Sequence, residues 1–407
     1  MPVYQYIARS AQGKLISGTA DGVNQSAVVK MLREKGLTTT SIQLNSMASA
    51  SASRRRQKRK GGRTKLDDLV IVSRQFSTMI RAGLPLIEVL NILSEQCDKV
   101  ELKNTLATVQ KDVESGSSLT EALQKHPRVF NMFYISMVRA GEAAGMLDAI
   151  LDQVAGYLEK TVALQRKIRS AITYPATVSV IACAITVFLL VRVVPVFEGI
   201  FEDLGGDLPL VTRITLGMSY FIQHHYLIII GIIAAVVIIL TQWRRTAHGR
   251  KALDSLKLRL PVFGPLFLKV AIARFSRTLG TLIKSGVNIL SALDIVAKSS
   301  GNVLIEEAVY RTRSSIQSGE SISKPLVESG VFPVMVTRMI DVGERTGALE
   351  TMLSKIAEFY EDQVDNTVAS LTSLIEPILI VFLGVVVGFI VISMFMPMFE
   401  MVELVSK

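Results

Sequence analysis

The chain has 407 residues, which is long for one typical hydrophobic core, so we expect two or three domains. Hydrophobic residues make up 49% of it and charged residues 20%, and mean hydropathy is +0.40; these values argue against both an ordinary soluble protein and a wholly buried polytopic transporter. The formal net charge of +10 is compatible with nucleic acid, anionic lipid or an acidic partner. Membrane proteins, however, carry excess Lys and Arg on their cytoplasmic face, so the charge requires no nucleic-acid partner.

Residues 1–45 predict a small α+β module. The stretch YQYIARSAQGKLISGTA alternates polar and apolar side chains around Gln12–Gly13, which is the pattern of a β-hairpin. A helix over Gln25–Lys35 that ends at Gly36 follows, and then a strand over Thr39–Leu44. The start of the chain has no apolar segment with a cleavage site, so we expect no signal peptide.

Residues 46–65 predict a flexible basic linker, because MASASASRRRQKRKGGRTK has no hydrophobic periodicity. Its cations suit membrane lipid or an acidic partner, at about 1 kcal/mol for each charge near a bilayer. A solvated linker without a partner explains the same composition, and the sequence leaves both interpretations open.

Residues 66–170 predict a cytoplasmic antiparallel bundle of helices. Over Leu66–Arg81 the apolar residues recur at helical spacing and give one apolar face. Gly83 stands where a left-handed C-terminal cap is needed, and Ser118-x-x-Glu121 has the pattern of a capping box. Strand alternation is absent, so the helices should be joined by short loops.

Three apolar runs predict transmembrane helices over 171–195, 226–243 and 375–397, each near the ~20 residues that a helix needs to cross a bilayer. A buried core helix is a weak alternative for the last two, because their apolar runs contain no ionisable residue. Arg192 lies near the end of the first, where its side chain can reach the headgroups. Five residues mark the expected membrane boundaries: Pro175, Pro195, Glu376, Pro377 and Pro397.

Charged residues flank these spans asymmetrically. Arg166, Lys167 and Arg169 precede the first span, and six Lys or Arg follow the second within 244–259, whereas the loop between them holds four acidic residues. The positive-inside rule then places the N-terminus in the cytoplasm, with the loop 196–225 and the tail 398–407 on the external side.

The second half of the chain repeats the first. RQFSTMIRAGLPLIEVL at 74–90 corresponds to RTLGTLIKSGVNILSAL at 277–293, an offset of 203 that becomes 202 after a deletion near Pro127. The repeated unit is a helical domain followed by a span. We therefore expect a cytoplasmic connector over 244–268 and a second cytoplasmic bundle over 269–374. The middle span has no counterpart and returns the chain across the membrane.

The motif GExxG occurs in both repeats, as GEAAG and GERTG. Glycines at i and i+4 open one face of a helix to close approach. One interpretation is packing inside each bundle, with the glutamate at a helix start where the dipole favours it. The other is contact with a partner or a second subunit. The candidate residues for either role are Gly141, Glu142, Gly145, Gly343, Glu344 and Gly347. In the third span, Gly384 and Gly388 predict tight helix packing within or between chains.

The sequence contains no phosphate-binding loop, no HExxH and no CxxC, and its four histidines fall at helix or span ends. The two cysteines, Cys97 and Cys183, predict no disulfide framework. We therefore expect no catalytic, cofactor-binding or metal-binding residues and no enzyme activity. A nucleotide-driven process would need its motor in another chain.

These features together resemble the GspF/PilC family over essentially the whole chain. The resemblance rests on QYxARxxxGKxxxG near the N-terminus, on MLREKGL at Met31–Leu37, on the two GExxG motifs, on Glu376–Pro377 and on MPMFE at 396–400. It implies a multi-pass platform protein of the bacterial inner membrane in type IV pilus assembly or type II secretion. Its N-terminus would be cytoplasmic and its C-terminus periplasmic.

The resemblance also implies partners. They are a hexameric assembly ATPase in the cytoplasm, the transmembrane helices of pilins or pseudopilins, other inner-membrane assembly proteins and further copies of the chain. The platform would couple the ATPase to the insertion of pilin subunits into a growing fibre, and we favour the pilus over the secretion system. A transporter built from parallel repeats is the rival from another class. Transporters usually carry ionisable groups near mid-span, and these spans carry none there.

Overall fold

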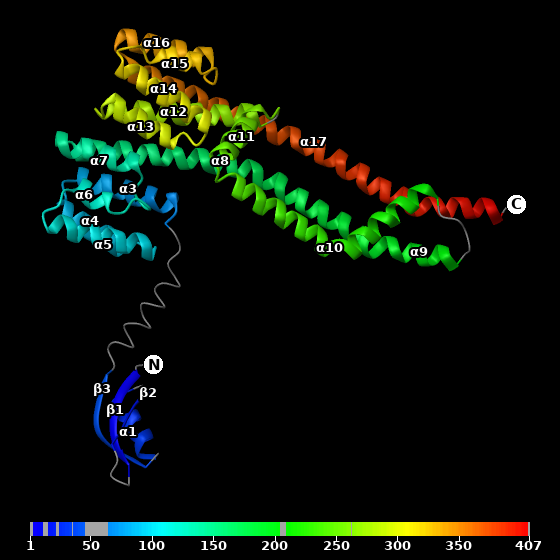
Figure 1. The fold of residues 1–407 in the computed structure, drawn as a ribbon, viewed down its shortest axis with the longest axis horizontal. Helices are drawn as coiled ribbons and strands as arrows, with labels where there is room; N and C mark the ends of the chain where they lie inside the picture. Colours follow the sequence, from blue (N-terminus) through cyan, green and yellow to red (C-terminus); the bar gives the residue numbers. More distant parts are fainter. Residues whose placement is uncertain are drawn as a thin grey trace. The chain divides into compact units, whose positions relative to one another are not determined.

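The computed structural model describes residues 3–10, 15–21, 24–34, 36–44, 64–203, 209–261 and 263–405 (Figure 1). The chain divides into two compact units, Met1–Val129 and Phe130–Lys407. The division falls inside the first predicted repeat. Helix α8, Leu147–Phe188, leaves that repeat and packs against helices of the second one, which explains why it is grouped with them.

The N-terminal module is an antiparallel sheet with one helix. Its strands β1 (Val3–Ser10), β2 (Leu15–Asp21) and β3 (Leu37–Leu44) pair in the order β2-β1-β3, and α1 spans Gln25–Glu34. In the register, Ile7 pairs with Ser17 on one side and Ser41 on the other. Val28 and Leu32 of α1 form the small core with Tyr4. The predicted α+β module is confirmed, while the Gln12–Gly13 turn and linker residues 46–63 lie outside the described residues.

Four helices complete the first unit: α3 (Leu66–Arg81), α4 (Leu86–Gln96), α5 (Val100–Glu114) and α6 (Leu119–Gln124). The bounds of α3 are those predicted, and it buries Leu69, Val72 and Phe76. Gly83 follows it with a φ of +85°. The capping box of α6 is present, since the Glu121 N–H donates to the Ser118 hydroxyl at 3.1 Å and the Ser118 N–H to the Glu121 carboxylate at 3.2 Å.

In the described part of the second unit, every regular element is a helix. Its elements are α7 (Met132–Ala144), α8, the π-helix η1 (Leu189–Val193), α9 (Val194–Asp203), α10 (Leu210–Trp243), α11 (Ala247–Arg259), α12 (Gly264–Lys284), α13 (Ile289–Ser299), α14 (Val303–Gln317), α15 (Ser323–Glu328), α16 (Val334–Thr346) and α17 (Leu349–Val405). Helices α8, α12 and α17 pack together, with Leu266, Val364 and Leu371 in a buried cluster that Leu164 and Ile168 of α8 cover.

Three helical segments are long and apolar enough to cross a membrane: Leu147–Gly199, Leu210–Trp243 and Leu349–Met396. Each of them overlaps an expected span and begins before it. Helices α8 and α17 run from the helical domains into the apolar segments without a break (Figure 1). Pro175 and Pro377 stand inside these helices and not at helix starts. A proline removes one intrahelical hydrogen bond, and neighbouring Ser and Thr hydroxyls help to satisfy a freed carbonyl in an apolar setting.

The region expected as an external loop, 196–225, is also largely helical. It contains the end of α9 and the first part of α10. Pro195 is the second residue of α9, and Pro397 lies within α17. The backbone of α10 leaves helical geometry at His225, directly before the predicted start of the second span at residue 226. The kink therefore lies at the predicted start of the second span, and the helix that precedes it was not predicted.

Candidate functional site

In the second repeat GERTG forms the corner between α16 and α17. Gly347 caps α16 with a φ of +71°, a left-handed conformation that residues with a Cβ adopt only with strain. One turn earlier Gly343 faces the start of α17. A Cβ at Gly343 would lie 3.0 Å from the Leu349 Cα and 3.0 Å from the Met352 Cγ. The two glycines are therefore needed for different reasons, one for backbone conformation and one for close packing.

The carboxylate of Glu344 reaches a third helix. The backbone N–H of Ile322, the residue before α15, donates to its two oxygens at 2.9 and 3.0 Å. A carboxylate beside the first N–H groups of a helix satisfies a donor and interacts favourably with the helix dipole. Glu344 itself lies in the last turn of α16, so the helix start beside its carboxylate is that of α15 and not that of its own helix. A left-handed glycine ends a helix, so GExxG closes α16 and Glu344 acts at the start of α15.

This hydrogen bond gives Glu344 a role inside the domain, which supports the packing interpretation at that position. The side chain is half-buried, and the neighbouring Asp341 accepts a hydrogen bond from the Ser323 hydroxyl at 3.3 Å. Arg345, in contrast, is exposed and lies 3.6 Å from Asp341. Contact of the motif with a partner stays a prediction.

In the first repeat GEAAG forms the corresponding corner between α7 and α8. Gly145 caps α7 with a φ of +64°, and the Met146 N–H donates to the Gly141 carbonyl at 2.9 Å. A Cβ at Gly141 would lie 3.0 Å from the Cβ of Ile150. Glu142 is half-buried. The two copies thus share the cap and the close approach, one helical turn apart.

A second set of contacts joins α8 to the second repeat. The hydroxyls of Tyr157 and Thr278 lie 3.0 Å apart in a buried position, and the Ser285 hydroxyl donates to the Gln153 side chain at 2.7 Å. Within the second repeat the Arg277 guanidinium donates twice to the Glu361 carboxylate, at 2.9 and 2.7 Å. The sequence does not predict these contacts, because side chains more than 80 residues apart leave no local pattern.

The described parts of the three apolar segments meet at the π-helix η1. The Ser219 hydroxyl of α10 donates to the Leu190 carbonyl at 2.5 Å, and Gln223 donates to the Val191 carbonyl at 3.4 Å. A π-helical turn displaces carbonyls from their usual partners, and unpaired carbonyls are costly in hydrocarbon. These donors stabilise the turn. Two turns earlier on α10, the Thr212 hydroxyl donates to the Ser393 carbonyl of α17 at 2.5 Å.

Among the described residues of this chain, the GxxxG pair of the third span has open space beside it. A Cβ at Gly384 or Gly388 would meet nothing within 4 Å. Glu376 and Pro377, just before this pair, are both exposed. Tight packing at Gly384 and Gly388 therefore stays a prediction, for a contact with another chain.

Among the described residues, no group of three or more His, Cys, Asp or Glu side chains is arranged to hold a metal ion. The features that the structure does build are corners, helix contacts and long apolar helices. These features define a class of membrane protein in which a helical domain leading into an apolar helix occurs twice.

Comparison with known families gives that class a name. Residues 72–195 and 275–397 each match the family described as Type II secretion system (T2SS), protein F, and residues 1–43 match the N-terminal domain of Type II secretion system protein F. The chain belongs to the Type II secretion system protein F family. The double match confirms the internal repeat, and the resemblance to GspF/PilC proteins is confirmed with it.

Relatives cover the whole chain. It is 44% identical over 407 residues to the type IV pilus assembly protein PilC of Thermus thermophilus, with 100% of both chains covered. It is 43% identical over 394 residues to the type IV pilus assembly protein PilC of Myxococcus xanthus, with 97% of this chain and 94% of the relative covered. It is 33% identical over 409 residues to the Type II secretion system protein F of Xanthomonas campestris pv. campestris, with 100% of both chains covered.

Proposed function

We propose that the chain is the inner-membrane platform of type IV pilus assembly, which couples a cytoplasmic hexameric ATPase to the insertion of pilin subunits into a growing fibre. One observation carries the proposal. Helices α8 and α17 each begin at a GExxG corner of a helical domain and continue without a break into an apolar segment. A displacement imposed on either domain by a partner is therefore passed to a span by a continuous helix.

The relatives favour the pilus over the secretion system. Those named type IV pilus assembly protein PilC are 44% and 43% identical to this chain, against 33% for a protein F of type II secretion. The platform of a type II secretion system acting on pseudopilins is the second candidate. In either system the family members are named as parts of assembly machinery, and we infer that this chain is not the motor but receives work from an ATPase.

A deletion strain tests the assignment. Removing the gene should abolish surface fibres while secreted proteins remain at their normal level, and the full-length chain should restore the fibres. Loss of secreted proteins with fibres intact would favour the type II secretion platform. Normal fibres and normal secretion would contradict both.

We infer further that both helical domains face the cytoplasm and that the C-terminus is periplasmic. The basic residues before the first span and after the second support this orientation. A reporter that is active only in the cytoplasm should be active when fused near residue 120 or 320. A reporter that is active only in the periplasm should be active when fused near residue 208. A periplasmic reporter at 320 would contradict a parallel arrangement of the repeats.

A further inference from the structure

A cleft of about 500 Å³ lies where α8, α17 and the α11–α12 connection meet. Its α8 wall runs from Ile168 to Ser179, and its α17 wall from Val368 to Ile375. The predicted first and third spans begin at residues 171 and 375. The cleft therefore lies at the expected boundary of the membrane, on the side from which the spans enter.

The lining of the cleft is almost entirely apolar. Ile172, Pro175, Phe263 and Leu371 contribute to its walls. Among the described residues that line it, Lys257 alone is ionisable. Its ammonium lies 2.7 Å from the Asp254 carboxylate, and the Lys257 side chain is 37% exposed, so part of its donor capacity faces outward.

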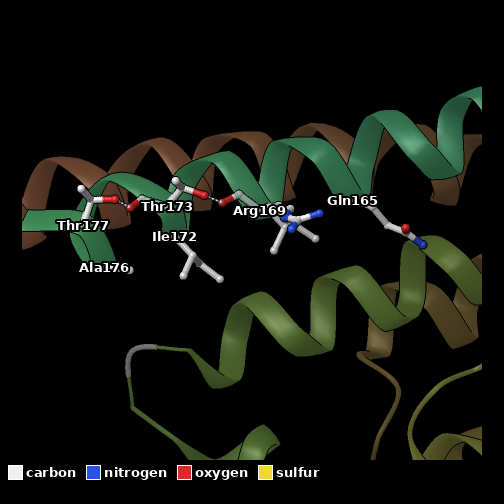
Figure 2. Close-up of a pocket in the computed structure, with 7 residues that line it drawn as sticks. Gln165, Arg169, Ile172, Thr173, Ala176 and Thr177 are labelled. Atoms are coloured by element: carbon white, nitrogen blue, oxygen red, sulfur yellow. Dashed lines mark hydrogen bonds between the residues drawn. The ribbon is translucent and has the colours of Figure 1, made fainter. Parts of the chain in front are cut away.

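The same strip of α8 also borders a second hollow, of about 520 Å³ (Figure 2). Ile172 and Ala176 line both spaces, and Figure 2 shows Ile172 extending from α8 toward the helices below it. Arg169 lines the second hollow and is exposed. Two cations thus stand near one apolar strip, Lys257 from α11 and Arg169 from α8.

We propose that the cleft holds one acyl chain of an anionic phospholipid, with the lipid phosphate beside Lys257. Anionic headgroups are recognised by basic pockets between helices on the cytoplasmic side of a membrane. The apolar lining matches an acyl chain, and the Lys257 ammonium matches a phosphate. This inference requires only that α8 and α17 cross a membrane, not that the protein assembles a pilus.

The size of the cleft separates a lipid from a transmembrane helix of a partner. A helix about 11 Å wide fills roughly 500 Å³ in one turn of 5.4 Å, so the whole cleft would hold a single turn. A volume of about 500 Å³ falls within the range of small-molecule sites, about 300–1,000 Å³. The volume of the cleft therefore fits an extended acyl chain and is too small for a second transmembrane helix.

Native mass spectrometry of the purified full-length protein tests the proposal. The protein in detergent is incubated with phosphatidylglycerol in one sample and with phosphatidylcholine of the same acyl chains in another. The detergent is then removed, and the lipid that stays bound is measured. The wild type should retain about fivefold more phosphatidylglycerol, as one cation near a bilayer surface provides. Lys257→Gln should reduce this preference, while Lys355→Gln, an exposed lysine of α17 outside the cleft, should leave it unchanged.

A second variant tests the apolar part independently. Ala176→Phe places a large side chain in the cleft and should lower retention of both lipids severalfold, whereas Ala234→Phe on exposed α10 should not. Since Asp254 is buried, Lys257→Gln is paired with the double variant Asp254→Asn/Lys257→Gln in case the single variant fails to fold. Equal retention of the two lipids by the wild type would overturn the proposal. Undiminished retention in Ala176→Phe, or a bound peptide with no lipid, would do the same.

Discussion

The two GExxG corners share one backbone conformation, but the first glycine of each motif approaches different atoms. Gly145 and Gly347 both adopt the left-handed conformation, with open space around the position of a Cβ. Gly141 approaches the branched side chain of Ile150, whereas Gly343 approaches the backbone of Leu349 as well as a methionine. The repeated sequence thus specifies the turn, while the fit of each corner depends on residues outside the motif.

The largest effect should come from filling the close approach. Gly343→Val should lower the free energy of unfolding by about 2–3 kcal/mol and Gly141→Val by about 1–2 kcal/mol, within the usual range for overpacking. The difference arises because a backbone atom at Leu349 cannot rotate away. The midpoint of thermal unfolding of the full-length protein in detergent measures both.

Gly384→Val is the matched control, because it makes the same substitution in a helix where a Cβ meets nothing within 4 Å. A similar loss of stability in this variant would mean that helix propensity, and not the close approach, explains the effect at the corners.

An intermediate and equal effect is expected at the left-handed caps. Gly145→Ala and Gly347→Ala should each cost about 1–2 kcal/mol, since the cost comes from backbone strain alone. Asn tolerates this conformation better, so Gly145→Asn and Gly347→Asn should be less destabilising. The same unfolding measurement applies. A marked difference between the two alanine variants would break the equivalence of the two corners.

The smallest effect should follow Glu344→Gln. The amide oxygen still accepts from the Ile322 N–H, but the charge is lost, so we expect a loss of about 0.5–1.5 kcal/mol. Fibre output should then follow the amount of protein in the membrane. Arg345→Gln, which changes an exposed charge next to it, is the control and should alter stability by a few tenths of a kcal/mol.

Glu142→Gln supplies the comparison in the first repeat. Loss of fibres at normal membrane abundance, in either glutamate variant, would show that the glutamate contacts a partner. Normal fibres in both single variants and in the double variant would leave packing as the only role.

Local sequence patterns predicted those structural features that depend only on residues close together in the chain. The apolar spacing of Leu66–Arg81 gave a helix with those bounds, and the Ser118–Glu121 pattern gave a capping box. The internal repeat, visible as an offset of 203 and then 202, corresponds to two matches of one family. These features are encoded within a few residues or in a direct comparison of the chain with itself.

Other features depend on context that the sequence does not display. The glycines of GExxG have the i, i+4 spacing of a packed helix face, but the second one ends the helix. Pro175 and Pro377 mark the expected membrane boundaries of two spans, yet α8 and α17 continue through both positions. The Arg277–Glu361 pair joins helices 84 residues apart, so no window along the chain contains both partners.

Helix α17 is long enough for a small change in its tilt to move its far end appreciably. Its 57 residues extend about 85 Å at 1.5 Å per residue, from the α16–α17 corner to the end that carries the third apolar segment. If the helix stays straight, a tilt of about 5° at the corner moves the far end by roughly 7 Å, more than one helical turn of rise. A small change in domain angle at the corner therefore becomes a sideways displacement of the far end that approaches the roughly 8–10 Å spacing of packed helices.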